Sequence, residues 1–311
     1  MSIFVRCWLA VSLLTATARA DEPLWTAKPV TAEKSFTTGI EGPNSDAAGI
    51  VYCVAYQNRG TIARVSPDGK IEVFVDLPLG KPDAKGKAKQ SFGNGIVFDS
   101  QEQMYVADYA NHNVLKIDPQ TKAISVFAHD DRFNQPNDLA IGPDDVIWCS
   151  DPAWGKNTGQ IFRVDTKGQI TLAAENLGTT NGIEVSPDGK TLYVNESVQR
   201  GIWAFPIGAD GKLGERKLVK QFDDFGFDGM RCDAEGRLFV SRYGKGTVVV
   251  LSPSGEVLHE IDVLGKSPSN VCFGGPDGKT VFVTEVEKTR LVSFRSDTPG
   301  LNWQRRQTAK K

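Results

Sequence analysis

Six residues that carry oxygen in their side chains recur at the start of six similar stretches of this 311-residue chain. The six residues are Glu41, Asn94, Asn137, Asn181, Asp228 and Asn270. They follow one another at intervals of 53, 43, 44, 47 and 42 residues. Carboxylate and carboxamide oxygens are the ligands that hard divalent cations such as Ca²⁺ and Mg²⁺ prefer. The pattern therefore predicts a site for a hard divalent cation if the fold brings these positions together.

A second explanation of the same residues is purely structural. Asn-Gly and Asp-Gly are common turn pairs because these residue types tolerate positive φ, so four or five of the six positions could be strand-entry turns. Glu41 does not fit that explanation, since glutamate is not a favoured turn residue. We therefore expect Glu41, Asn181 and Asp228 to be the metal ligands. Without a cation, at least one of the two carboxyl groups should hold a proton, because like charges that converge in a narrow channel repel each other.

The stretches that carry these residues predict the fold. The clearest runs from Thr179 to Ser197, where apolar residues alternate on each side of a Pro-Asp-Gly turn, as in two antiparallel strands. A second hairpin follows each of the first five copies, which gives four strands per repeat. A period in the forties is typical of a propeller blade. We predict one all-β domain over residues 21–311, a six-bladed β-propeller with four-stranded antiparallel blades.

The last repeat predicts how the propeller closes. Only one strand follows its first hairpin, which leaves this blade one strand short. The segment from Pro29 to Thr38 precedes the first repeat without a partner, so we predict that an N-terminal strand closes the last blade. The first strand of each blade lines the channel of a propeller, and the six oxygen-bearing residues should therefore form a ring around it. The C-terminal tail, residues 301–311, is basic and is expected to be frayed.

A second ring is expected where the second strand of each blade ends. Its members are Tyr56, Asp108, Asp151, Glu196, Arg242 and Glu285. We interpret Asp108 and Glu285 as solvated rim residues. Asp151 is expected nearer the first ring and is followed by a loop that carries Trp154, so both are candidates for substrate contacts.

The start of the chain predicts export. Residues 1–20 combine a positive Arg6, an apolar run and an Ala-Arg-Ala sequence before Asp21, which is typical of a cleaved signal peptide. We expect a periplasmic or secreted protein that begins at Asp21. The apolar run is too short to span a bilayer and no later segment reaches about 20 apolar residues, so no membrane span is predicted. The formal net charge of −2 gives no indication of nucleic-acid binding.

Four cysteines follow the predicted signal peptide. They are Cys53, Cys149, Cys232 and Cys272. Disulfides would be possible in an exported protein, but each cysteine lies among apolar residues of a different repeat, which favours buried free thiols. The chain has no HExxH, P-loop or GxSxG motif, so zincin and nucleophile-elbow hydrolase chemistry have no support in the sequence.

Several of these stretches together resemble the gluconolactonase, or senescence marker protein/regucalcin, family of six-bladed propellers. The similar stretches are IEGP at Glu41, QPNDL at Asn137, TNGIEVSPDGKTLYV at Asn181 and FDGMRCD at Asp228. The resemblance implies a divalent metal near the channel mouth at Glu41, Asn181 and Asp228. It implies that Asn137 binds metal or substrate. It also implies hydrolysis of sugar lactones or, in relatives, of other esters and phosphotriesters.

The leading hypothesis is a lactonase with one divalent metal, Ca²⁺ being favoured over Mg²⁺, Mn²⁺ and Zn²⁺. Asp228 is the candidate catalytic base as well as a metal ligand, and a small lactone is the expected partner. The candidate substrate-binding residues are Asn94, Asn137, Asp138, Asp151 and Trp154. Many members of the family carry arginine at the position of Gln135, where it contacts a sugar-like substrate, and Arg132 is the candidate replacement here.

Two alternatives belong to other functional classes. One is a non-catalytic propeller that binds a protein or glycan on its top face, and the other is a metal-dependent phosphotriester hydrolase. A binding propeller needs no converging carboxylates on its axis. The pair Glu41 and Asp228 therefore favours an enzyme.

Overall fold

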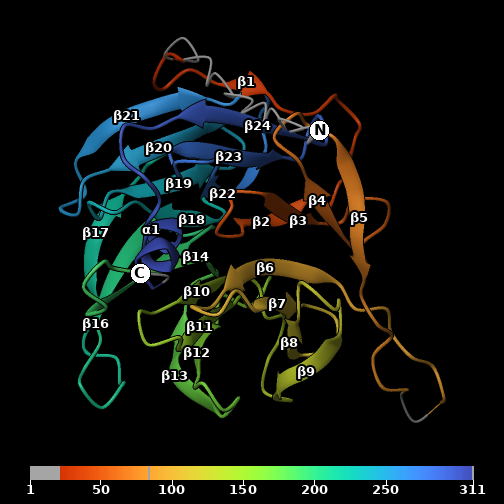
Figure 1. Cartoon of the computed structure of the whole chain (residues 1–311). Helices are drawn as coiled ribbons and strands as arrows, with labels where there is room; N and C mark the ends of the chain where they lie inside the picture. The colour runs from red at the N-terminus through yellow and green to blue at the C-terminus, as the bar shows by residue number, and fades with distance from the viewer. Residues whose placement is uncertain (1–21, 83–84, 310–311) are drawn as a thin grey trace, which may run out of the picture.

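The computed structural model describes residues 22–82 and 85–309, so the predicted signal peptide lies outside the described residues. Six four-stranded antiparallel sheets stand around a central axis, and one edge strand of each sheet faces that axis (Figure 1). The protein is a six-bladed β-propeller, as the repeats predict. Each of the first five repeats forms one complete sheet.

The first five blades have the same strand order from the axis outward. Blade 1 consists of β2 (Glu41–Ser45), β3 (Val51–Val54), β4 (Thr61–Val65) and β5 (Ile71–Asp76). Blade 2 consists of β6 (Gly93–Phe98), β7 (Met104–Asp108), β8 (Asn113–Ile117) and β9 (Ile124–His129). Blade 3 consists of β10 (Leu139–Ile141), β11 (Ile147–Asp151), β12 (Gly159–Val164) and β13 (Ile170–Leu177). Blade 4 consists of β14 (Thr180–Val185), β15 (Thr191–Glu196), β16 (Gly201–Pro206) and β17 (Lys217–Gln221). Blade 5 consists of β18 (Met230–Cys232), β19 (Leu238–Arg242), β20 (Thr247–Leu251) and β21 (Val257–Asp262).

The sixth blade joins the two ends of the chain. It consists of β22 (Pro268–Gly274), β23 (Thr280–Glu285), β24 (Arg290–Arg295) and the N-terminal strand β1 (Lys28–Pro29). The prediction that an N-terminal strand closes the last blade is confirmed. The regular strand is only two residues long and begins one residue before the predicted segment. Beyond Pro29 the chain turns and stays beside β24 through single hydrogen bonds. One of these joins the backbone N–H of Val30 to the carbonyl of Leu291 at 2.9 Å.

Deleting residues 22–38 tests this closure. The deletion should leave the outer edge of β24 without a partner, and an exposed strand edge can pair with other chains. We expect the product to aggregate when its purification is followed by size-exclusion chromatography with light scattering. A monomeric product that unfolds cooperatively would show that the N-terminal strand is dispensable for closure.

Apolar side chains pack between the facing sheets of neighbouring blades. Between blades 1 and 2, for example, Val54 and Ile62 belong to one buried cluster with Ile96 and Val106. The four cysteines that follow the predicted signal peptide lie in such interiors as free thiols, as predicted. Burial also raises the pKa of the Cys53 thiol. The packed interfaces hold each inner strand at a fixed distance from the axis, which is what a ring of functional side chains requires.

Acidic residues at the ends of second strands fix the segments that enter their own blades. Asp108 accepts a hydrogen bond from the backbone N–H of Phe92, and Glu285 accepts one from that of Ser267. Both carboxyl groups are fully buried, so the interpretation of Asp108 and Glu285 as solvated rim residues is wrong. The reason is that the N–H groups of the entering segments need acceptors once they are removed from water.

The C-terminal residues form a helix, so the expectation of a frayed tail is wrong for residues 301–309. Helix α1 (Leu301–Ala309) lies over the channel, near the centre of Figure 1, at the end where the inner strands finish. Arg305 donates to the carbonyl of Ser186 and Arg306 to that of Ser45, which ties α1 to two inner strands. Over the described residues, no helix is long and apolar enough to cross a bilayer.

Candidate active site

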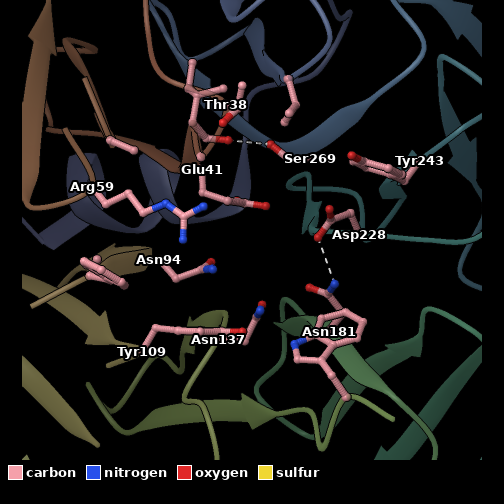
Figure 2. A pocket seen from close by; sticks show the side chains of 17 residues that line it. Thr38, Glu41, Arg59, Asn94, Tyr109, Asn137, Asn181, Asp228, Tyr243 and Ser269 are labelled. Carbon is pink, nitrogen blue, oxygen red and sulfur yellow. Dashed lines mark hydrogen bonds between the residues drawn. The ribbon is translucent and has the colours of Figure 1, made fainter. Parts of the chain in front are cut away.

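A cavity of about 450 Å³ opens at the end of the channel where the inner strands begin. Five of the six predicted ring residues line it, namely Glu41, Asn94, Asn137, Asn181 and Asp228. Figure 2 shows their polar ends directed toward a common space. The sixth residue, Asn270, is buried outside the cavity lining. Burial raises the pKa of Glu41, and the Asn270 side chain opposes that rise. The structure therefore brings five of the six repeated oxygen-bearing positions together around one cavity.

The glycines that follow these residues allow the blades to approach one another. The backbone N–H of Gly95 donates to the Asn137 carbonyl at 2.8 Å, and that of Gly182 donates to the Asp228 carbonyl at 3.2 Å. A Cβ on Gly182 would lie 2.6 Å from the same Asp228 carbonyl. The φ angles of Gly95 and Gly182 are not positive. These Asn-Gly pairs are therefore not turns, and their glycines permit hydrogen bonds between the inner strands of adjacent blades.

The two carboxyl groups at the cavity floor lie side by side. Asn181 donates from Nδ2 to Asp228 Oδ1 at 2.8 Å, while the backbone N–H of Gly42 donates to Glu41 Oε2 at 2.6 Å. The two carboxyl groups are close enough to affect each other's ionisation. Burial raises the pKa of Glu41 to about 7. Burial and the neighbouring Glu41 carboxylate raise the pKa of Asp228 well above its ordinary value. The pair therefore holds a proton near neutral pH when no cation is bound.

Two buried amide oxygens among the described residues have no hydrogen-bond donor, Oδ1 of Asn94 and Oδ1 of Asn181. The Nδ2 of Asn181 is occupied by Asp228 and by Ser197 Oγ, which leaves Oδ1 facing the cavity (Figure 2). A buried oxygen without a partner is unfavourable by about 1 to 3 kcal/mol, and a bound cation would satisfy both oxygens. Asn94, which the sequence assigned to substrate binding, thus offers its oxygen in the same way as Asn181.

The donor set fits a hard cation. It consists of two carboxylates and several amide oxygens, the ligand type of Ca²⁺ and Mg²⁺. The described residues contain no group of three or more His, Cys, Asp and Glu side chains that could hold a metal. The described residues that line this cavity include neither histidine nor cysteine, the nitrogen and sulfur ligands that structural zinc prefers.

Several residues that line the cavity were missed in the sequence. They include Thr38, Arg59, Phe92, Tyr109, Tyr243 and Ser269. Tyr109 and Tyr243 come directly after the second strands β7 and β19. Each tyrosine therefore follows a member of the predicted second ring, and a search one residue beyond that ring would have identified both as candidates. Arg59 lies in the connection between β3 and β4, which has no fixed place in the repeat.

Two predicted substrate-binding residues do not line the cavity. Asp138 is fully buried and forms a bidentate ion pair with Arg231, at 2.8 and 2.9 Å. Asp151 is also fully buried and accepts hydrogen bonds from the backbone N–H groups of Asn134 and Gln135, at 2.8 and 2.6 Å. Burial raises the pKa of Asp151 to about 6. Both carboxyl groups support the chain behind the cavity wall.

The remaining candidates are divided between the cavity and the surface. Trp154, predicted to contact substrate, lines the cavity together with Asn94 and Asn137. Arg132, the candidate replacement for the family arginine, is paired with Asp130 at 2.6 Å and does not line the cavity. The only cationic side chain among the described residues of the cavity lining is instead Arg59.

The sequence of this chain matches a known protein family. The family described as SMP-30/Gluconolactonase/LRE-like region has a sequence model that matches residues 83–287. The chain therefore belongs to this family.

Individual relatives match over most of the chain. The gluconolactonase of Zymomonas mobilis subsp. mobilis is 28% identical over 306 residues, which cover 89% of this chain and 85% of the relative. The diisopropyl-fluorophosphatase of Loligo vulgaris is 28% identical over 293 residues, which cover 86% of this chain and 90% of that relative. The structure of a gluconolactonase from Xanthomonas campestris aligns with a TM-score of 0.72 at 22% identity, covering 90% of this chain and 96% of the other. This last likeness supports the propeller fold.

Proposed function

We propose that this protein is a metal-dependent lactonase that hydrolyses sugar-type lactones to their open hydroxy acids. The observation that carries the proposal is the pair of carboxyl groups, Glu41 and Asp228, beside two unpartnered amide oxygens at the cavity floor. Burying two adjacent carboxylates is unfavourable unless a cation or a proton offsets their charge. A propeller that only binds a partner has no need of that arrangement. Membership of the family and the similarity to a gluconolactonase over 89% of the chain support the same function.

Each residue of the cavity floor has a distinct role in this proposal. Glu41, Asn181 and Asp228 would hold the cation, and Asn137 is a further metal ligand or a substrate contact. A bound divalent cation supplies Lewis-acid polarisation of the lactone carbonyl. Asp228 accepts a proton from the attacking water as the oxygen of that water bonds to the carbonyl carbon. The ring C–O bond then breaks, and the leaving oxygen takes the proton that Asp228 had accepted, which gives the hydroxyl group of the product and restores the Asp228 carboxylate.

Metal analysis of protein purified without chelator, combined with a panel of substrates, tests the proposal. The panel should contain aldonolactones and, because of the similarity to a diisopropyl-fluorophosphatase, diisopropyl fluorophosphate. We expect one divalent cation per chain and hydrolysis of lactones that stops when the metal is chelated. Preference for the fluorophosphate would indicate a phosphotriester hydrolase, and no turnover of any substrate would favour a binding propeller.

A separate measurement tests export. Protein recovered outside the cytoplasm should begin at Asp21, and its intact mass shows whether residues 1–20 have been removed.

Cation affinity is expected to fall as the pH is lowered through about 7. Burial raises the pKa of Glu41 to about 7, so below that pH the carboxyl group binds a proton that it must release before it can bind a metal. For exchange of one proton, the affinity for Ca²⁺ at pH 6 should be about tenfold weaker than at pH 8. Isothermal titration calorimetry with Ca²⁺, in buffers of different ionisation enthalpy, measures both the affinity and the proton released.

Glu41→Gln is the matched variant for this measurement. The amide keeps the shape of the side chain but neither titrates nor carries charge. We expect weaker Ca²⁺ binding, a flatter pH dependence and partial recovery of lactonase activity at high metal concentration. An unchanged pH dependence in the variant would mean that the proton exchanged on binding does not come from Glu41.

A further inference from the structure

Arg59 brings an unmatched positive charge to the cavity. It lies in the connection between β3 and β4 of blade 1, and its side chain lines the cavity. Figure 2 shows its guanidinium group directed between Glu41 and Asn94, toward the space above the cavity floor. The side chain passes over the ring of Phe92, with the guanidinium carbon 5.7 Å from the ring centroid. The arginine is thus aimed at the volume that a substrate would occupy.

No carboxylate partner is found for Arg59 among the described residues. By contrast, Arg64 of the same blade is paired with Glu72 at 3.1 Å, and Arg132 is paired with Asp130 at 2.6 Å. No ion pair joins Arg59 to either acid of the cavity, since Asp228 contacts Asn181 and Glu41 is held by Gly42. The guanidinium group is therefore free to bind a ligand.

The charge balance of the cavity favours a negatively charged ligand. Glu41 and Asp228 are the two acids among the described residues that line it, and Arg59 is the one base. A divalent cation on the two carboxylates would neutralise them and leave one positive charge at Arg59. An arginine binds carboxylate, sulfonate or phosphate oxygens through parallel N–H groups. Tyr109 lies close enough for Arg59 to lower the pKa of its phenol, although burial raises that pKa overall. Its hydroxyl could donate to the same anion.

We propose that Arg59 selects lactones that carry an anionic group remote from the ring carbonyl, such as a carboxylate or a phosphate. This inference rests on the proposed lactonase function. The carbonyl end of such a substrate lies over Glu41 and Asp228, and its anionic end lies against Arg59 and Tyr109. The residue acts on substrate binding and takes no part in the bond changes.

Steady-state kinetics with three lactones test the proposal. The probes are 6-phosphoglucono-δ-lactone, glucaro-1,4-lactone and neutral glucono-δ-lactone, so that phosphate and carboxylate are distinguished. We expect Arg59→Met to reduce kcat/KM for the preferred anionic lactone by about 10- to 100-fold, the range of a hydrogen-bonded charge pair. The effect should appear in KM with kcat nearly unchanged. The neutral lactone should change by less than about twofold. Arg59→Lys should keep part of the preference, because it keeps the charge and loses the paired N–H groups.

Arg64→Met is the control, because it removes an arginine of the same blade whose side chain is paired with Glu72 outside the cavity. It should leave all three lactones unaffected. An equal loss on neutral and anionic lactones in Arg59→Met, or a wild-type enzyme without preference for an anionic lactone, would overturn the proposal.

A binding measurement separates this inference from the proposed function. Calorimetry with 6-phosphogluconate and with gluconate compares two open-chain acids that differ by one phosphate, and it does not need turnover. Tighter binding of the phosphate compound that disappears in Arg59→Met would support the anion subsite even if no lactone were hydrolysed. Hydrolysis of lactones with no difference between the two acids or among the three lactones would retain the lactonase and reject the role of Arg59.

Discussion

Replacing Asp228 with asparagine is expected to lower kcat for lactone hydrolysis by roughly 10² to 10⁴, the usual loss when a general base is removed. The amide keeps the shape of the side chain and can still accept the hydrogen bond from Asn181 Nδ2. It cannot accept a proton from water at neutral pH. Saturating metal should therefore fail to restore turnover, although the variant also loses a charged metal ligand. Initial rates over a metal titration, with affinity measured separately, give the two effects independently.

Glu41→Gln is the comparison that gives this result its meaning. Both variants remove one negative charge from the same cavity, so both should bind the cation more weakly. At saturating metal, kcat should remain low in Asp228→Asn, whereas Glu41→Gln should recover part of its activity. If metal-saturated Asp228→Asn turned over a lactone at close to the wild-type rate, the base would be another group. Glu41 would then be the remaining carboxyl group among the described lining residues, since Asp151 lies behind the wall.

The repeat made the fold and the cavity floor predictable. A propeller places equivalent residues of each repeat at equivalent distances from the axis, so the positions of Glu41, Asn181 and Asp228 followed from the alignment of the copies. The structure added why glycine follows several of these residues. The inner strands approach so closely that the backbone N–H groups of these glycines donate hydrogen bonds to backbone carbonyls of the next blade.

The remainder of the site depends on contacts that a linear pattern does not contain. Arg59 lies in a connection whose length is not set by the repeat, so its direction could not be inferred. Asp138 was expected to bind substrate, but its carboxyl group pairs with Arg231, which is distant in the sequence. Asp108 and Glu285 were interpreted as rim residues. Their carboxylates accept hydrogen bonds from the segments that enter their blades, and the position of these segments is known only from the three-dimensional structure. Asp138, Asp108 and Glu285 each have a hydrogen-bond partner that is distant in the sequence.

The ion pair between Arg231 and Asp138 leads to the largest expected effect on stability. The side chains are 4% and 0% exposed, and two hydrogen bonds of 2.8 and 2.9 Å join them inside the channel. Glu184 is also buried, which raises the pKa of its carboxyl group, and the charge of Arg231 opposes that rise. Replacing Arg231 with methionine removes the cation while keeping much of the volume. The carboxyl groups that it faces would then lack their compensating charge.

We expect Arg231→Met to lower the free energy of unfolding by about 3 to 5 kcal/mol, the range found when one partner of a buried ion pair is removed. Urea denaturation followed by fluorescence and far-UV circular dichroism measures it. Arg64→Met removes a solvent-exposed pair in blade 1 and should change stability by no more than about 1 kcal/mol. Adding Asp138→Asn to Arg231→Met should recover part of the loss, because it removes the buried charge that Arg231 had neutralised. If the double variant were no more stable than Arg231→Met alone, lost packing around the arginine stem would account for the destabilisation instead of an uncompensated carboxylate.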